Sequence, residues 1–175
     1  MKYLVAFLFA AVFAITAHAA SPENTLVVEL KDGPVEIELY PDAAPKHVER
    51  IKALANDGFY DGIKFHRVIK GFMAQAGCPY GQGTGGPGYH IPHEGKVAVK
   101  HDSRGTLSMA RTNDPNSGGS QFFVTFGPTA NLDVSRRSAG YTVFGRMVEG
   151  EETLAAIEAA AGSPRPPSTP TEPLT

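Results

Sequence analysis

Glycine and proline limit what this chain can fold into more than any other feature of its sequence. The 175 residues include 19 Gly and 14 Pro. Proline lacks the backbone N–H that helix interiors and central strands use, and glycine weakens both elements. The composition therefore argues against a helical bundle, and the length fits one domain. The composition predicts a single, loop-rich and mainly β domain over residues 20–175.

Alternating apolar and charged residues predict short antiparallel strands. Residues 26–40 alternate in this way around a turn that contains Gly33 and Pro34, a pattern typical of a β-hairpin. Apolar and β-branched residues gather in further short segments, each bounded by turn residues. These segments predict strands at 63–69, 72–76, 105–110, 121–126 and 141–147.

Two segments have the spacing of amphipathic helices. Asp42 can cap a helix that has Pro45 in its first turn, and Gly58 can end that helix. A second helix is expected at 151–160, where apolar residues recur at helical spacing. Many short strands with two isolated helices predict a β-barrel or sandwich capped by helices.

The first nineteen residues have the composition of a signal peptide. Lys2 precedes a short apolar stretch, and Ala17 and Ala19 occupy the small-residue positions of a signal peptidase site. The alternative is an uncleaved membrane anchor, but the apolar stretch is short for a membrane span. We expect cleavage after Ala19, export of residues 20–175, and no stable membrane insertion afterwards.

The last fourteen residues form a proline-rich tail. Residues 162–175 contain five prolines, which are incompatible with a helix interior or a central strand. We therefore expect the tail to add neither a helix nor a central strand to the domain.

Charge and cysteine content exclude two classes of function. The net charge is −2, and basic residues are scattered along the chain, so no nucleic-acid-binding surface is expected. Cys78 is the single cysteine, which excludes an intramolecular disulfide framework and a zinc site built from cysteines.

Two glycine-containing motifs resemble known signatures but lack a necessary part. Residues 81–86 match the dinucleotide fingerprint G-x-G-x-x-G, yet Pro87 follows where a helix would have to begin. Ser120 lies in a segment similar to the nucleophile elbow of hydrolases, but Phe122 replaces the required final glycine. A flexible loop and a turn hydroxyl are the expected structures.

Three potential metal ligands occur close together. His90, His93 and Glu94 could take part in a metal-dependent hydrolase site. Pro92 prevents the helical spacing that would place both histidines on one face, and a fourth ligand is not evident. We therefore expect no metal and no other cofactor.

Two predicted strands carry an apolar side chain and an amide on the same face. Met73 and Gln75 are two residues apart, as are Gln121 and Phe123, so each pair shares a face of its strand. Core packing with exposed glutamines would explain either pair alone. Arg67 lies nearby in the sequence.

The order of several motifs identifies a resemblance. The chain resembles the cyclophilin family of peptidyl-prolyl cis–trans isomerases, especially exported bacterial members. The matching segments cover nearly the whole chain after the signal peptide: FYDGIKFHRVIKGFMAQAG (59–77), GTGGPGY (83–89), RGTLSMAR (104–111), SGGSQFF (117–123), NLD (131–133) and YTVFG (141–145).

The resemblance implies a fold, a compartment and a missing element. The expected fold is an eight-stranded antiparallel β-barrel capped by two α-helices, with a single domain at 20–175 in the periplasm. Relatives usually close the barrel with a hydrophobic strand after a proline-containing segment. The sequence has no such strand after its tail, so we expect the final strand to be missing from this chain.

The resemblance also implies a set of site residues. Arg67 is expected to be catalytic, and Tyr141 occupies a place where many relatives have His. The expected substrate-binding residues are Phe72, Met73, Gln75, Ala110, Arg111, Gln121, Phe123, Leu132 and Tyr141. Rotation about an X–Pro bond breaks no bond, so neither a nucleophile nor a general base is needed.

The implied partners are proline-containing unfolded or extended polypeptides, whose folding the protein would assist. The alternative is a chaperone of the same fold that binds proline segments with little turnover. Relatives that bind cyclosporin tightly carry Trp before the pocket leucine, whereas this chain has Asn131 there. Weak cyclosporin binding is therefore expected.

Overall fold

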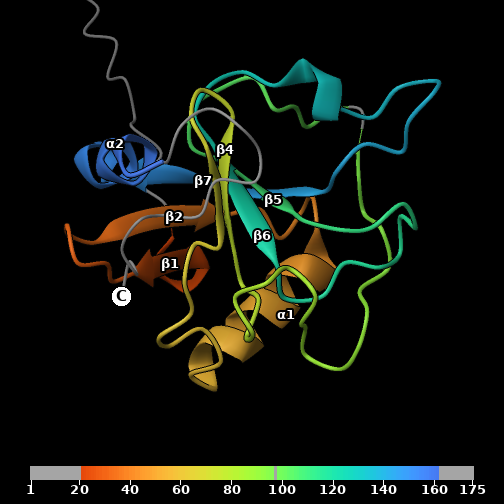
Figure 1. Ribbon diagram of the computed structural model, residues 1–175. Coiled ribbons are helices and arrows are strands. Elements are labelled where there is room, and N and C mark those ends of the chain that lie inside the picture. The colour runs from red at the N-terminus through yellow and green to blue at the C-terminus, as the bar shows by residue number, and fades with distance from the viewer. Residues whose placement is uncertain (1–20, 97, 162–175) are drawn as a thin grey trace, which may run out of the picture.

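One antiparallel sheet forms the centre of the molecule (Figure 1). The structure is a computed structural model that describes residues 21–96 and 98–161, so the predicted signal peptide and the tail 162–175 lie outside the described residues. The strand order is β1-β2-β7-β5-β6-β4-β3. The strands are β1 (Thr25–Val28), β2 (Val35–Leu39), β3 (Arg67–Ile69), β4 (Met73–Ala76), β5 (Thr106–Met109), β6 (Phe122–Thr125) and β7 (Val143–Glu149).

The sheet register places one row of small and aliphatic residues in the core. Val68, Ala74, Val124 and Leu107 are direct partners on four neighbouring strands. All four are buried and belong to one hydrophobic cluster. Since side chains alternate between the two faces of a strand, the residues on either side of this row point away from the core.

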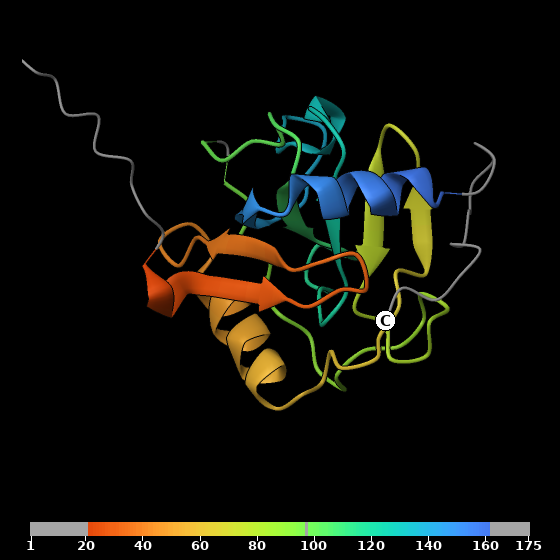
Figure 2. The same cartoon turned by 90° about the vertical axis from the view of Figure 1, so that its left-hand side faces the viewer.

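Two helices lie at opposite ends of the sheet (Figure 2). Helix α1 (Pro45–Asn56) buries Val48 and Ile51, and α2 (Glu151–Ala159) packs on the sheet. Two 3-10 turns, η1 (Pro22–Asn24) and η2 (Ala130–Leu132), complete the elements. Pro45 is in the first turn of α1, as predicted, but Asp42 is not its cap: the N-cap residue is Ala44, without a side-chain hydrogen bond.

Gly58 ends α1 as the sequence predicted. Its φ of +70° is in the left-handed region that glycine adopts readily, and the N–H of Phe59 donates to the carbonyl of Leu54 at 2.9 Å. The chain then turns back toward β3. This turn shortens the strand expected at 63–69, because residues 63–66 do not pair and only Arg67–Ile69 forms a strand.

The expectation of a closed barrel of eight strands is not confirmed. Seven strands form among the described residues, and β1 and β3 are the two edges of an open order. Strands β1 and β3 do not pair with each other in this part of the chain, so the sheet does not close. The eight-stranded barrel, and the absence of its final strand from this chain, stay predictions.

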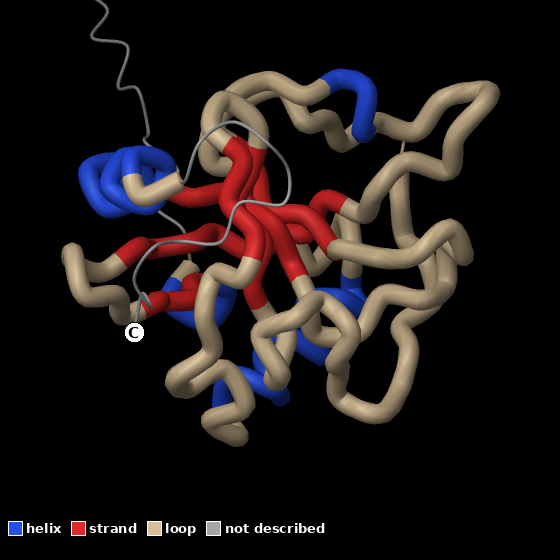
Figure 3. Tube along the Cα trace, viewed as in Figure 1, coloured by secondary structure: helices blue, strands red, loops and turns tan. Residues whose placement is uncertain are grey.

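Long loops cover the side of the sheet away from α2 (Figure 3). They include the connection from β4 to β5 and the segment that contains η2. Among residues 21–96 and 98–161, no helix has both the length and the apolar character needed to cross a membrane.

Candidate active site

A second row of paired residues lies next to the core row and faces the other way. Arg67 on β3 is opposite Gln75 on β4, and Gln75 is opposite Phe123 on β6. Ser108 on β5 continues the row as the partner of Phe123. Strand register alone therefore brings an arginine, an amide and an aromatic ring to one outer surface.

This row lines a small cavity of about 190 Å³. Nine of the ten site residues expected from the resemblance line it: Arg67, Phe72, Met73, Gln75, Ala110, Arg111, Phe123, Leu132 and Tyr141. Met73 and Phe123 are 2% and 5% exposed, so the apolar wall is well packed. The structure brings these residues together, while their individual roles in binding and catalysis stay predictions.

Gln121, the tenth residue, lies just outside the cavity and supports it. Its Oε1 accepts a hydrogen bond from Gln75 Nε2 at 3.0 Å. Its own Nε2 donates to the carbonyl oxygens of Gly83 and Gly85 at 3.0 and 2.8 Å. Gln121 therefore connects the β4–β5 loop to the cavity wall.

The Arg67 guanidinium is oriented by a neutral partner. Its Nη1 donates to Gln75 Oε1 at 3.3 Å, and that amide is fixed in turn by Gln121. Among the described residues, no carboxylate lies within ion-pair distance of Arg67. The guanidinium charge is therefore available to a ligand in the cavity, with N–H donors to spare.

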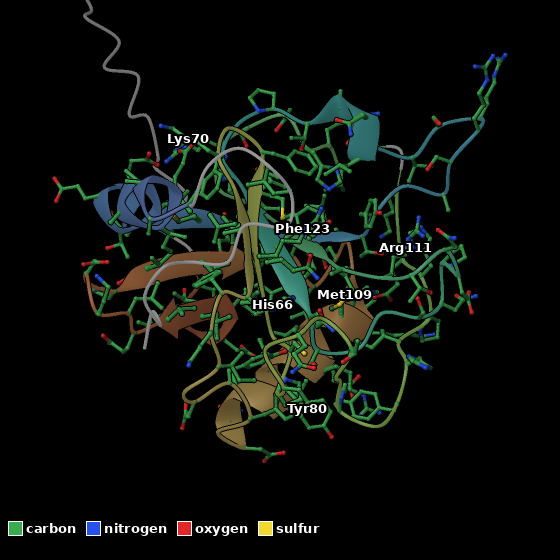
Figure 4. The ribbon with its side chains drawn as sticks, in the orientation of Figure 1. His66, Lys70, Tyr80, Met109, Arg111 and Phe123 are labelled. Atoms are coloured by element: carbon green, nitrogen blue, oxygen red, sulfur yellow. The ribbon has the colours of Figure 1, made fainter. Side chains whose placement is uncertain are left out.

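Tyr141 and Leu132 form the wall opposite the strands. The backbone N–H of Tyr141 donates to the Leu132 carbonyl at 3.0 Å, which holds η2 next to the start of β7. The Tyr141 ring meets the Phe123 ring edge to face, with centroids 5.6 Å apart. Arg111 covers Tyr141 at 4.5 Å from the ring centroid and lies on the loop side of Phe123 (Figure 4).

A buried polar network lies beneath the cavity, and the sequence interpretation missed it. His101 is 1% exposed, and its Nδ1 donates to Asp133 Oδ1 at 2.8 Å. Ser108 Oγ lies 3.0 Å from both His101 Nε2 and the Thr142 carbonyl oxygen. No spacing in the sequence signals this contact, because His101 and Asp133 are 32 positions apart.

The network determines the charge state of His101. Burial lowers the pKa of the His101 imidazole, and the hydrogen bond to Asp133 opposes that shift without cancelling it. Neutral His101 has one ring N–H, which it donates to the Asp133 carboxylate. The Ser108 hydroxyl donates its single proton to the Thr142 carbonyl oxygen, and its Oγ lies 3.0 Å from His101 Nε2. Ser108 and His101 are fully buried and act on the cavity through Phe123, not as a nucleophile and base.

Ser120, His93 and Glu94 have structural roles. Ser120 Oγ is buried and donates to the Gly77 carbonyl at 2.7 Å. His93 Nε2 contacts the Ala139 carbonyl at 2.9 Å, and the Glu94 carboxylate accepts from the backbone and ring of His47. In the part of the chain that the structure describes, no three His, Cys, Asp or Glu side chains gather as metal ligands.

Larger hollows than this cavity exist on the described part of the chain. One of about 640 Å³ lies beside β2 and is lined by both acidic and basic residues, among them Asp42, Lys100 and Arg146. None of the expected site residues lines it. The small cavity beside Arg67 therefore fits the expected chemistry better than this larger hollow.

The cavity combines an apolar wall with the guanidinium groups of Arg67 and Arg111 on the outer surface of an antiparallel sheet. The sequence model of the family described as "Cyclophilin type peptidyl-prolyl cis-trans isomerase/CLD" matches residues 25–173. The chain belongs to this family, and it is a peptidyl-prolyl cis–trans isomerase. The resemblance stated from the motifs is thereby confirmed at the level of the family.

Curated relatives support the same assignment. A probable peptidyl-prolyl cis-trans isomerase of Brucella suis is 45% identical over 157 residues, which cover 82% of this chain and 76% of the relative. Peptidyl-prolyl cis-trans isomerase B of Bacillus subtilis is 48% identical over 124 residues, covering 70% of this chain and 82% of the relative.

Solved structures agree with the fold. A cyclophilin type isomerase of Cryptosporidium parvum superposes with a TM-score of 0.79 at 32% identity, covering 86% of this chain and 92% of the other. A second structure of that protein, in the presence of the dipeptide Ala-Pro, has a TM-score of 0.78 at 32% identity, covering 86% of this chain and 93% of the other.

Proposed function

We propose that the cavity beside Arg67 is where this isomerase binds proline and rotates the preceding peptide bond. The observation that supports this most directly is the Arg67 guanidinium, held by one neutral amide next to the apolar residues of the cavity wall. A pyrrolidine ring is compact and apolar. It fits a wall made of Phe72, Met73 and Phe123.

Arg67 is the group that lowers the barrier in this proposal. An amide resists rotation by roughly 18–20 kcal/mol because its nitrogen lone pair is delocalised. In the twisted state the lone pair is localised on nitrogen, where a donor can bind it. Arg67 donates an N–H to that nitrogen, and other N–H groups remain for a neighbouring carbonyl. The apolar surroundings strengthen these hydrogen bonds.

Arg67 alone is not sufficient. A 10⁵-fold acceleration would require about 7 kcal/mol of selective transition-state stabilisation. One charge-assisted hydrogen bond contributes about 1.5–3 kcal/mol. The remainder must come from the orientation of the proline ring and from backbone contacts near Gln75, Ala110 and Arg111.

We further propose that the protein acts on exported polypeptides and assists their folding in the periplasm. The support is the signal-peptide pattern of residues 1–19, with Ala17 and Ala19 before the expected cleavage point. Expression of the full chain in a bacterium, followed by mass determination of the periplasmic fraction, tests this. A mature protein that begins at Ala20 is expected, and retention of the intact chain in the cytoplasm would contradict the proposal.

An assay on a short X–Pro peptide separates isomerisation from the alternatives. Magnetisation-exchange NMR should show faster cis–trans interconversion with catalytic amounts of protein, unchanged by a chelator and without cleavage of the peptide. Stoichiometric binding without acceleration would instead support the chaperone of the same fold. Chelator-sensitive cleavage would support the metal-dependent hydrolase.

A further inference from the structure

Two guanidinium groups line the cavity, and no acidic side chain does. Arg67 and Arg111 are both part of its lining, and the described residues that line it include neither Asp nor Glu. A larger hollow of about 690 Å³ adjoins it, and the two share Gln75, Ala110 and Arg111 as a ridge. The described lining of this second hollow also lacks Asp and Glu.

Arg111 lies on the ridge between the two hollows and is held rigidly there. Its Nε and Nη2 donate to the Gly140 carbonyl at 3.0 and 2.6 Å, and its Nη1 donates to the Thr112 carbonyl at 2.8 Å. The guanidinium also stacks on Tyr141. All of these partners are uncharged, so they fix the position of the guanidinium without neutralising its charge.

Part of the Arg111 donor capacity remains unused. A guanidinium has five N–H groups, and the three contacts with Gly140 and Thr112 use three of them. Among the described residues, no Asp or Glu forms an ion pair with Arg111. A preorganised cation with free donors is a suitable partner for a carboxylate on a ligand.

We propose that Arg111 makes the enzyme select X–Pro segments with an acidic residue next to the proline. This inference rests on the proposed site, because it places proline in the cavity beside Arg67. When the proline of a peptide lies in this cavity and the peptide backbone crosses the ridge, the side chain of the residue next to the proline comes close to Arg111. A carboxylate on that side chain gains attraction from Arg111 and, at longer range, from Arg67.

The expected selectivity is moderate. Two unit charges about 8 Å apart attract by about 0.5–2 kcal/mol, depending on how far water screens them. This corresponds to an approximately two- to thirtyfold preference for an acidic residue over its neutral isostere. The attraction is the same for the planar peptide bond of the bound substrate and for the twisted transition state. It therefore lowers KM and leaves kcat nearly unchanged.

Two pairs of tetrapeptides test the inference by magnetisation-exchange NMR. In one pair Glu or Gln precedes the proline, and in the other pair Glu or Gln follows it. The measured quantity is the Glu-to-Gln ratio of kcat/KM within each pair, at low and high salt. At least one pair should favour Glu by about two- to thirtyfold at low salt, and salt should reduce the ratio.

Variants assign the preference to Arg111. Arg111→Gln should bring the ratio close to one, and Arg111→Lys should keep most of it because the charge remains. Arg146→Gln is the matched control, since Arg146 is an exposed arginine of β7 outside both hollows. It should leave the ratio unchanged. Unfolding midpoints show which variants are folded.

The outcomes distinguish this inference from the proposed site. Equal rates for Glu and Gln in both pairs would overturn the inference alone, as would a preference that persists in folded Arg111→Gln. Loss of the preference in a folded Arg111→Lys variant, which keeps the positive charge, would show that charge at this position does not cause the preference. Failure to isomerise any of the four peptides would overturn the proposed site, and the inference with it.

Discussion

The imidazole of His101 stacks on the ring of Phe123, with ring centroids 6.1 Å apart and the ring planes inclined by 11°. Phe123 is part of the cavity wall, whereas His101 belongs to the buried network with Asp133 and Ser108. Asp133 also accepts a hydrogen bond from the backbone N–H of His101 at 2.8 Å. The network therefore supports the cavity wall at Phe123 and fixes the end of η2, which carries Leu132.

The first prediction concerns Arg67. Arg67→Ala should lower kcat/KM for an X–Pro peptide by at least about a hundredfold, or about 2.7 kcal/mol in transition-state free energy. The fold should survive because the side chain lies on the outer row of the sheet. Arg146→Ala is the control and should keep full activity. Near-normal turnover by folded Arg67→Ala would remove the proposed mechanism.

The second prediction concerns acid stability. Burial lowers the pKa of His101 in the folded protein below its usual 6.5. At a pH between the folded pKa and 6.5, His101 binds a proton in the unfolded chain but not in the folded chain. The free energy of unfolding should therefore fall as pH decreases through 6.5. His47 and His66 also have pKa values lowered by burial and contribute in the same direction.

Urea denaturation at pH 7.5, 6.5 and 5.5 measures this effect. His101→Gln should make the loss of stability below pH 6.5 smaller, because one of the buried histidines is gone. His90→Gln replaces an exposed histidine and should leave the pH dependence as it is. Stability that increases on acidification, or an identical pH dependence in His101→Gln, would contradict the account of the network.

At lower pH, Asp133 makes a second contribution. Burial raises the pKa of its carboxyl, but hydrogen bonds from the backbone and ring of His101 outweigh this effect and leave the pKa below its usual range. This stabilisation is complete above the ordinary pKa of an aspartate and is lost as pH falls through the folded value. Asp133→Asn should reduce the loss of stability on acidification below about pH 4, measured by the same denaturation series.

The fourth prediction uses two glycines that share a backbone conformation but differ in their surroundings. Gly140 and Gly62 have φ of +65° and +72°. A Cβ on Gly140 would lie 2.5 Å from the backbone nitrogen of Val134, whereas a Cβ on Gly62 meets nothing within 4 Å. Gly62→Ala should cost about 1–2 kcal/mol from the backbone conformation alone, and Gly140→Ala at least about 3 kcal/mol.

Urea midpoints of the two variants compare these costs. Gly140→Ala should also lower activity, since the Gly140 carbonyl anchors Arg111 and the next residue is Tyr141. Equal stability losses in Gly62→Ala and Gly140→Ala would show that the chain around Gly140 relaxes without cost.

The last prediction concerns the rim of the cavity. Asn131 is exposed and precedes Leu132 in η2, where the resemblance places Trp in relatives that bind cyclosporin tightly. A buried aromatic anchor contributes roughly 2–4 kcal/mol to an interface. Its absence should weaken cyclosporin binding by roughly 30- to 1,000-fold, while catalysis beside Arg67 is affected less.

Asn131→Trp provides both the change and the readout. The chain contains no Trp, so this variant would add the only indole fluorescence, and its response to cyclosporin reports binding directly. Asn131→Leu is the matched control for apolar area without the indole N–H. Nanomolar inhibition of the unsubstituted protein would show that the rim residue does not limit binding.

Local sequence patterns determined most of the secondary structure. The hairpin at 26–40, the helix that Gly58 ends and the helix at 151–160 follow from residues close together in the chain, and the structure contains all three. The ordered motifs determined the family in the same way, since many short matches together leave little room for chance. Asp42 failed as a cap because the helix begins three residues later, where the preceding turn places Pro45.

Only the tertiary structure decided how distant residues meet. The register of β3, β4 and β6 aligns Arg67, Gln75 and Phe123, and packing brings His101 to Asp133 and Arg111 to the Gly140 carbonyl. Only the tertiary structure shows that the sheet is open, because closure requires hydrogen bonds between its edge strands β1 and β3, which are far apart in the sequence. The physical reason is that propensity and periodicity act between neighbours in the chain. Register, burial and the orientation of charged side chains depend instead on contacts between segments that the sequence keeps far apart.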